Sequence, residues 1–571
     1  MKKIIDLLEE EVSKAFENCG YDKDFGKVTV SARPDLCEFQ CNGAMAAAKS
    51  HKKSPMIIAG EIEQKLKDIN IFENISIVAP GFINLKVTAG FIANYCNSII
   101  KAEKLGCVIK EGKTIVMDYG GPNVAKPLHV GHLRPAIIGE SLKRIHRFFG
   151  DTVIGDVHLG DWGLQMGLII EELKCRGLKS FTIDELEEIY PAASAKAKVD
   201  EEYKERARAN TVLLQQKKGE YYEIFKKIVE VSVKDLKENY KKLNVEFDLW
   251  LGESDSQDYI EEMIEMMRNK GLVYESEGAL VIDVAKPDDN VTINPCMVLK
   301  SDGAACYQTT DLATLLQREK DYKPDQVIYV VDKRQEMHFI QVFRAAKKAE
   351  LVNPNAELIF VGFGTMNGKD GKPFKTRDGG VVKLESLIDE VNGKVYSKLM
   401  ENRDIPEEEA NETSKIIGLA ALKYADLSNQ VSKDYIFDLE RFTSFEGNTG
   451  PYILYTIVRI KSIIRKYLEI HPESNEGAEI LPPQENSEKN LMLIIAKCNE
   501  MIEQSYIYNE PHKICNYIYE LSNAFSIFYH DIKILSSEEK KLKSYITLLY
   551  LVKDILETSI DLLGFSVPDR M

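Results

Sequence analysis

One stretch of the chain decides the fold: Asp118-Tyr-Gly-Gly-Pro-Asn-Val-Ala-Lys-Pro-Leu-His-Val-Gly-His-Leu-Arg134. The segment that leads into it, 113–118, is short, apolar and β-branched, which predicts a buried strand. After it, apolar residues recur at helical spacing up to Phe149, and Gly150 stands where a glycine commonly ends a helix. A second apolar strand is predicted at 152–154. Open α/β sheets bind nucleotides at loops of this kind, so we expect a nucleotide site here.

The loop contains His129-Val-Gly-His132, whose residue types suit a phosphate group. Gly131 allows the backbone and a ligand to approach closely. His129 and His132 can donate hydrogen bonds to phosphate oxygens, and a helix N-terminus favours the same negative charge. The tetrapeptide alone is a weak signal, because HxGH occurs by chance in many chains and a histidine at a helix start is commonly a cap or a surface residue.

The longer stretch carries more information. His129-Val-Gly-His132 resembles the HIGH motif of class I aminoacyl-tRNA synthetases, and 122–134 as a whole resembles the arginyl-tRNA synthetase form of it. Further along, 155–167 resembles the GDWG segment of that family, and 447–459 and 511–529 resemble its DALR anticodon-binding helices. The resemblance covers the full length of the chain. It implies ATP-dependent attachment of L-arginine to its tRNA through an arginyl-adenylate intermediate.

The length and pattern predict several domains, because 571 residues with 44% hydrophobic content exceed what one core holds. We expect an α/β, Rossmann-like class I catalytic domain at 113–445, with a helical insertion, a hairpin, at about 180–247. By resemblance, 1–112 forms a small α/β domain that contacts tRNA. The remainder, 446–571, forms an all-α, DALR-type anticodon-binding bundle.

The resemblance implies an arginine site formed by Asn123, Glu253, Tyr307, Asp311 and Gln341. Carboxylates meet a guanidinium, a planar fork of donors, with two parallel hydrogen bonds. Glu253, Tyr307 and Asp311 are therefore expected at the guanidinium end, and the two amides at the α-amino and carboxylate end. A structural alternative for part of this set is that Thr310 caps the following helix and Asp311 complements its dipole.

Neither step of the implied reaction needs a protein nucleophile; both need positioning and charge stabilisation. The implied catalytic residues are Lys126, His129, His132, Lys375 and Arg377. The implied ATP-binding residues are His129, Gly131 and His132. The loop at 365–380 lacks the GxxxxGK[ST] pattern of a P-loop and resembles a degenerate KMSKS motif, the second motif of class I. On one alignment both lysines of that motif are missing, so we expect Lys126 to do part of their work.

The segment 155–167 is rich in glycine, and Asp161, Trp162 and Gln165 supply polar and stacking groups. We expect it to form a wall of the active site. The alternative is a glycine-rich turn around a buried tryptophan.

The amino-acid composition excludes several further classes of protein. Without an apolar run of about 18 residues or a signal-peptide core, we expect a soluble, cytoplasmic protein with no membrane segment. The ten cysteines form no CxxC pair, so we expect reduced, structural thiols and no zinc site. The net charge of −16 argues against nonspecific coating of nucleic acid, while a local basic face remains compatible with RNA.

The implied partners are tRNA for arginine, L-arginine and ATP, and we expect a monomer. Mg²⁺ is expected to accompany ATP, without a dedicated protein metal site. Two other classes of function stay open. One is a different nucleotidyl transferase or class I synthetase, although the acidic pair Glu253 and Asp311 argues against a glutamyl type. The other is a noncatalytic RNA-binding relative, which is expected to have lost the HxGH histidines or the basic loop.

Overall fold

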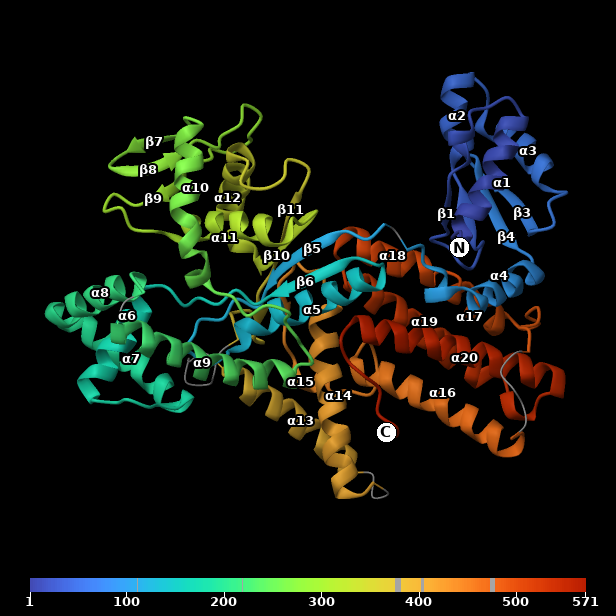
Figure 1. Ribbon diagram of the computed structural model, residues 1–571. Helices are drawn as coiled ribbons and strands as arrows, with labels where there is room; N and C mark the ends of the chain where they lie inside the picture. The colour runs from blue at the N-terminus through green and yellow to red at the C-terminus, as the bar shows by residue number, and fades with distance from the viewer. Residues whose placement is uncertain (110, 218, 375–381, 402–404, 473–477) are drawn as a thin grey trace. The chain divides into compact units, whose positions relative to one another are not determined.

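The computed structural model describes residues 1–109, 111–217, 219–374, 382–401, 405–472 and 478–571 (Figure 1). The chain divides into two compact units. The first comprises Met1–Val108, Ile453–Ile507 and Lys513–Ser559, and the second comprises Ile109–Tyr452, Tyr508–His512 and Ile560–Met571. The expected division into three domains remains a prediction. In the described residues, no helix is both long and apolar enough to cross a membrane.

The first unit contains an antiparallel sheet of order β1-β2-β4-β3. In β4 the apolar side chains of Ile83, Leu85 and Val87 share one face of the strand and are fully buried. The strands are β1 (Val28–Val30), β2 (Phe39–Cys41), β3 (Phe72–Val78) and β4 (Phe82–Val87). The helices of this part are α1 (Ile4–Asn18), α2 (Gly43–His51), α3 (Pro55–Leu66) and α4 (Ala89–Lys101), with 3₁₀ turns at Lys23–Gly26 and Glu103–Gly106.

The C-terminal helices supply the rest of the first unit. Side chains join them to the N-terminal part: the amide of Asn97 exchanges hydrogen bonds of 2.9 and 2.8 Å with the backbone of Ile480. Lys489 forms ion pairs with Glu38 and Glu73 at 2.7 and 2.8 Å. The helices are α16 (Gly450–Ile470), α17 (Asn486–Ile495), α18 (Cys498–Tyr508), α19 (His512–Asp531) and α20 (Glu539–Leu562), with a 3₁₀ turn at Ile534–Ser536.

The second unit is built on a parallel sheet of order β11-β10-β5-β6 (Figure 1). The strand and helix predicted around the deciding stretch are confirmed: β5 spans Thr114–Tyr119, and α5 spans Leu133–Phe148. Gly150 has φ +100°, the backbone conformation for which a glycine suits a helix end. The other strands are β6 (Thr152–Asp156), β10 (Gln326–Asp332) and β11 (Glu357–Phe363).

A large apolar core lies between this sheet and three helices. Val116 of β5 and Val327 of β10 meet Leu315 and Val342 there, all fully buried. Because parallel strands are covered by helices, they read as continuous apolar runs, as these do. The helices are α10 (Gln257–Asn269), α11 (Tyr307–Tyr322) and α12 (Glu336–Ala349).

The insertion differs from the helical hairpin that was predicted. It contains three helices, α7 (Ile183–Val199), α8 (Glu201–Gln215) and α9 (Gly219–Lys242), after α6 (Leu164–Arg176). Asp200 separates the first two, because its extended backbone ends α7 and its carboxylate accepts the backbone N–H of Tyr203, 2.9 Å away, at the start of α8.

A second correction concerns α11, which begins at Tyr307 and not at Thr310. The backbone N–H of Cys306 donates to Thr309 Oγ1 at 2.8 Å, so the N-cap residue is Cys306, four residues before Thr310. The remaining elements complete the second unit. They are β7 (Val273–Ser276), β8 (Ala279–Ile282), β9 (Cys296–Leu299), β12 (Met366–Asn367), β13 (Tyr435–Ile436), α13 (Leu384–Met400), α14 (Glu407–Leu427), α15 (Leu439–Phe442), and 3₁₀ turns at Val130–His132, Glu253–Ser256 and Lys333–Gln335.

Candidate active site

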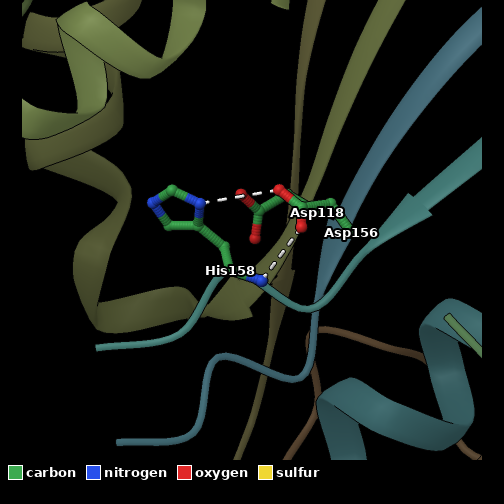
Figure 2. Close-up of side chains that lie close together, drawn as sticks. All are labelled: Asp118, Asp156 and His158. Carbon is green, nitrogen blue, oxygen red and sulfur yellow. Dashed lines mark hydrogen bonds and ion pairs between the residues drawn. The ribbon is translucent and has the colours of Figure 1, made fainter. Parts of the chain in front are cut away.

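A single guanidinium joins the carboxyl ends of β5 and β6. Arg318 of α11 is fully buried, and its Nη2 donates to Asp118 Oδ2 at 2.6 Å and to Asp156 Oδ2 at 2.7 Å. Figure 2 shows the two carboxylates side by side at the strand ends, with the ring of His158 beside them. This cluster holds the edge of the sheet from which the nucleotide loop leaves.

His158 stands next to these acids in an unusual backbone conformation, with φ +43°. Its Nδ1 lies 3.5 Å from Asp156 Oδ2. Burial alone would lower the pKa of His158, but Asp156 and Asp118 raise it to about 9. Asp118, Asp156 and His158 are a set that a metal ion could use. Arg318 already supplies the cation between the carboxylates, so the set does not fit a resident metal.

The HxGH segment forms a 3₁₀ turn that opens α5. The backbone N–H of His129 donates to His132 Nδ1 at 3.1 Å, and the N–H of Gly131 donates to His129 Nδ1 at 3.0 Å. Because each Nδ1 accepts, each ring carries its proton on Nε2. Burial lowers the pKa of His132 to about 3 and also lowers that of His129. The turn therefore presents two neutral Nε2–H donors at a helix N-terminus, as a phosphate requires.

Lys126 lies close to this turn. Its charge contributes to the lowered pKa of both histidines. Its Nζ stands 4.4 Å from the ring centroid of Tyr190, on α7 of the insertion. Lys126 is therefore half-buried against an aromatic ring and is not a fully solvent-facing loop lysine. The other two expected cations, Lys375 and Arg377, lie outside the described residues.

Asn123 is held between two loops. It pairs with Gly160 in a parallel bridge, and its Oδ1 accepts a long hydrogen bond of 3.5 Å from Gln165 Nε2. Gln165 Nε2 also donates to the carbonyl of Gly160 at 2.8 Å. A Cβ on Gly160 would lie 2.2 Å from Asn123 Oδ1. The glycine therefore makes room for the Asn123 side chain at the carboxyl edge of the sheet.

Two of the three side chains expected to line a wall at 155–167, Trp162 and Asp161, are buried. The indole of Trp162 is buried, donates to Gln257 Oε1 at 2.8 Å and packs against Phe225. It supports the site from inside and offers no open stacking face. Asp161 is buried too, and accepts hydrogen bonds from the backbone N–H and the hydroxyl of Ser254 at 2.9 and 2.7 Å.

Glu253 is the first residue of the 3₁₀ turn Glu253–Ser256. Its backbone N–H donates to the carbonyl of Leu159 at 3.0 Å, which places Glu253 beside the β6 loop. Burial raises the pKa of Glu253 to about 7; Asp161 and Asp311 raise it as well, and His158 opposes them. The carboxylate of Asp311 is therefore close enough to Glu253 to raise its pKa, as expected for two acids that share a pocket.

The remaining arginine candidates are only partly assembled. Asp311 Oδ2 is 2.5 Å from His338 Nε2. Gln341, one helical turn after His338, donates to the carbonyl of Asn294 at 2.8 Å. Tyr307 is 74% exposed, so its ring lies outside the acidic pair. Sequence reasoning missed Arg318, whose partners are far away in the chain, and it assigned no role to His338.

Three family profiles match the chain. They are described as tRNA synthetases class I (R), catalytic domain, over residues 95–439; DALR anticodon binding domain, over 453–571; and Arginyl tRNA synthetase N terminal domain, over 2–87. Arginine–tRNA ligases of Agathobacter rectalis and Alkaliphilus oremlandii are 56% and 53% identical to it, with 100% of both chains covered. The chain belongs to the arginyl-tRNA synthetase family.

Solved structures of the family agree with this assignment. The arginyl-tRNA synthetase of Plasmodium falciparum has a TM-score of 0.83 at 26% identity, with 100% of both chains covered. That of Thermus thermophilus has a TM-score of 0.79 at 21% identity and 100% coverage of both chains, and shows the fold alone. The expected fold class is confirmed. The roles of individual side chains remain predictions.

We expect Gly160→Ala to weaken arginine binding about fivefold, because the new Cβ would push Asn123 aside and one hydrogen bond is worth about 1 kcal/mol. Gly163→Ala is the matched control, since a Cβ there meets nothing within 4 Å. The Michaelis constant for arginine in tRNA charging measures both. Equal constants in the two variants would show that Asn123 does not contact the substrate.

Proposed function

We propose that the chain attaches L-arginine to its tRNA in two steps at the carboxyl edge of the parallel sheet. In the first step, the α-carboxylate of arginine attacks the α-phosphorus of ATP, giving arginyl-adenylate and pyrophosphate. In the second, a terminal ribose hydroxyl of the tRNA attacks the activated carbonyl and AMP leaves. Both displacements require the protein to position the reactants and to stabilise the charge that develops on them.

One observation carries the proposal: the same sheet edge presents neutral phosphate donors and buried carboxylates. The Nε2–H groups of His129 and His132 open α5, which follows β5. Glu253 is tied to the loop after β6 through Leu159. A substrate with a guanidinium at one end and a carboxylate at the other would span from the acids to the triphosphate.

On the nucleotide side, His129, Gly131 and His132 bind the phosphates, and Lys126 supplies positive charge near them. A preorganised donor of this kind is typically worth about 10²–10³ in rate. Lys375 and Arg377 are proposed to complete the cationic set. Mg²⁺ is proposed to arrive with the triphosphate, where it would neutralise phosphate charge, and no described side chain is assigned to hold it.

On the amino-acid side, Glu253 and Asp311 face the guanidinium. Tyr307, whose ring is exposed at the start of α11, would have to turn toward the acids to join them. Asn123 and Gln341 hold the α-amino and carboxylate end. A site with buried carboxylates rejects an uncharged isostere such as citrulline, because an acid would be left without its partner. A glutamyl-type synthetase needs the opposite charge at this place, so the acidic pair disfavours it.

The tRNA is proposed to contact residues 1–112 and the helical residues 446–571, and the protein to act as a monomer in the cytoplasm. A noncatalytic RNA-binding relative is the second candidate. The retained HxGH turn, with both rings oriented as donors, disfavours it.

Charging of total tRNA with each of the twenty amino acids tests the proposal. We expect ATP-dependent charging with arginine alone. Equal or better charging with another amino acid would identify a different class I synthetase. Binding of tRNA without consumption of ATP in the presence of arginine would identify the noncatalytic relative.

The affinity for arginine is expected to rise with pH through Glu253. Its pKa of about 7 means that it is largely protonated and neutral at pH 6 and ionised at pH 8. Because only the carboxylate pairs with a guanidinium, the dissociation constant of arginine should fall about tenfold between these values. Calorimetric titration at both pH values, in wild type and Glu253→Gln, measures this. A slope that persists in Glu253→Gln would assign the titrating group elsewhere.

Lys126→Ala is expected to lower the turnover number by about 10²-fold and to change the Michaelis constant for ATP much less, the pattern of a contact made mainly in the transition state. Lys196→Ala is a control, because that insertion lysine pairs with Glu172 and not with the HxGH turn. Steady-state kinetics of charging give both constants. Near-normal turnover in Lys126→Ala would show that Lys126 has only a structural role, through its contact with Tyr190.

A further inference from the structure

The helical insertion holds the loop that leads into the HxGH turn at two consecutive residues, Ala125 and Lys126. The backbone N–H of Ala125 donates to Ser232 Oγ, on α9, at 2.9 Å. The ammonium of Lys126 lies 4.4 Å from the ring centroid of Tyr190, on α7. Two helices of the insertion therefore contact the nucleotide loop just before its histidines, although both are distant from it in the sequence.

The contact at Ala125 supports a backbone conformation that alanine rarely adopts. Ala125 has φ +57°, in the left-handed region, where a Cβ is sterically costly. Ser232 Oγ donates its own proton to the carbonyl of Ile228 at 2.7 Å, so toward Ala125 it acts as an acceptor. Ala125 and Ser232 are 1% and 2% exposed, and a buried N–H without a partner is costly. The hydroxyl of Ser232 therefore stabilises the bend from which Lys126 leaves the loop.

The contact at Lys126 limits where its ammonium can lie. Lys126 and Tyr190 are both half-buried. A lysine side chain has a flexible stem, and an aromatic face that attracts the ammonium removes part of that freedom. The charge of Lys126 acts on both histidines of the turn, because it contributes to their lowered pKa. Tyr190 therefore keeps a cation close to the two Nε2–H donors.

A third contact shows that the same face of α7 lies along the HxGH turn. Glu187, one helical turn before Tyr190, pairs with Lys383 at 2.6 Å. Lys383 in turn forms an antiparallel bridge with His129. The ion pair is partly exposed and contributes little stability by itself. Its position nevertheless places α7 beside the HxGH turn as well as beside Lys126.

We propose that Tyr190 and Ser232 are positioning residues of the reaction, which hold Lys126 in the orientation in which its ammonium meets the phosphates of ATP. The insertion is then part of the catalytic apparatus. The inference rests on the proposed function, which places the triphosphate at the HxGH turn. It goes beyond that function, because it assigns a kinetic role to two side chains that need not touch a substrate.

Variants of Tyr190 separate the aromatic face from the bulk of the side chain. In Tyr190→Leu, we expect the turnover number of arginine charging to fall about three- to tenfold and the Michaelis constant for ATP to change less than about twofold, because a cation needed mainly in the transition state is less well held. Tyr190→Phe keeps the face and should stay within about twofold of wild type. Tyr221→Leu is the matched control, since Tyr221 of α9 stands over Lys174 in the same way, with 4.3 Å between the ammonium and the ring centroid.

A double-variant cycle tests whether Tyr190 acts through Lys126. In a Lys126→Ala background, Tyr190→Leu should cause no further loss of turnover, because the ammonium that it held is absent. Additive losses would show that Tyr190 acts by another route and would overturn the proposal. If Lys126→Ala turns over normally, the proposed role of Lys126 fails and this inference fails with it. If Lys126→Ala is impaired and Tyr190→Leu is not, this inference alone fails.

Ser232→Ala tests the second contact. We expect its turnover number to fall about five- to tenfold, because the buried N–H of Ala125 loses its acceptor and the strained bend can relax. Thr211→Ala is the matched control, since the hydroxyl of Thr211 donates to the carbonyl of Ala207 within α8 of the same insertion, at 2.9 Å. Normal turnover in Ser232→Ala would overturn the role assigned to Ser232.

Thermal unfolding of each full-length variant separates positioning from a general loosening of the insertion. A loss of turnover in Tyr190→Leu and Ser232→Ala that Tyr190→Phe restores and that both controls lack supports the proposal. A loss that Tyr221→Leu and Thr211→Ala share, or that follows the melting temperature across the whole set, would assign the effect to stability and overturn it.

Discussion

The site depends on the guanidinium of Arg318. Its Nη2 binds the acids at the ends of β5 and β6, and it lies on α11, two turns after Asp311. Residues seven apart share one face of a helix, so the helix that presents an acid to the pocket is fixed against the edge that presents the nucleotide loop. A buried ion cluster therefore fixes the distance between Asp311 on α11 and the loop that leaves β5.

Such a cluster is costly unless every charge has a counter-charge, because removing one partner of a buried pair typically costs about 3–5 kcal/mol. Here Arg318 lies between Asp118 and Asp156, and His158 adjoins Asp156. Burial alone would raise the pKa of Asp156, yet His158 and Arg318 hold it at about 2; burial keeps the pKa of Asp118 above its ordinary value. We infer that the cluster contributes rigidity more than net stability. Rigidity is what an in-line displacement needs from its scaffold.

Local patterns predicted the features that local physics determines. β5, α5 and the glycine end at Gly150 follow from apolar periodicity and backbone conformation, and the structure has them where they are expected. The predicted start of α11 was wrong, because Thr309 and not Thr310 accepts the backbone N–H of Cys306. Arg318 had no signal, since its partners are 200 and 162 residues away and no spacing rule links them. Roles in the arginine pocket came from family resemblance, because no periodicity brings such distant residues together.

The histidines of the site are tuned in opposite directions by their surroundings. Burial lowers the pKa of His132 to about 3 and lowers that of His129, so both remain neutral donors. The neighbouring aspartates raise the pKa of His158 to about 9 against the effect of burial, so it remains charged. Around pH 7 these three keep their charge state, while Glu253, with a pKa of about 7, does not. In the proposed site, phosphate binding is thus separated from proton exchange, and amino-acid selection is coupled to it. A guanidinium that pairs there with Glu253 lowers the pKa of that carboxyl, so a proton is released to solvent, whereas a nucleotide at the HxGH turn meets imidazoles that are already neutral donors.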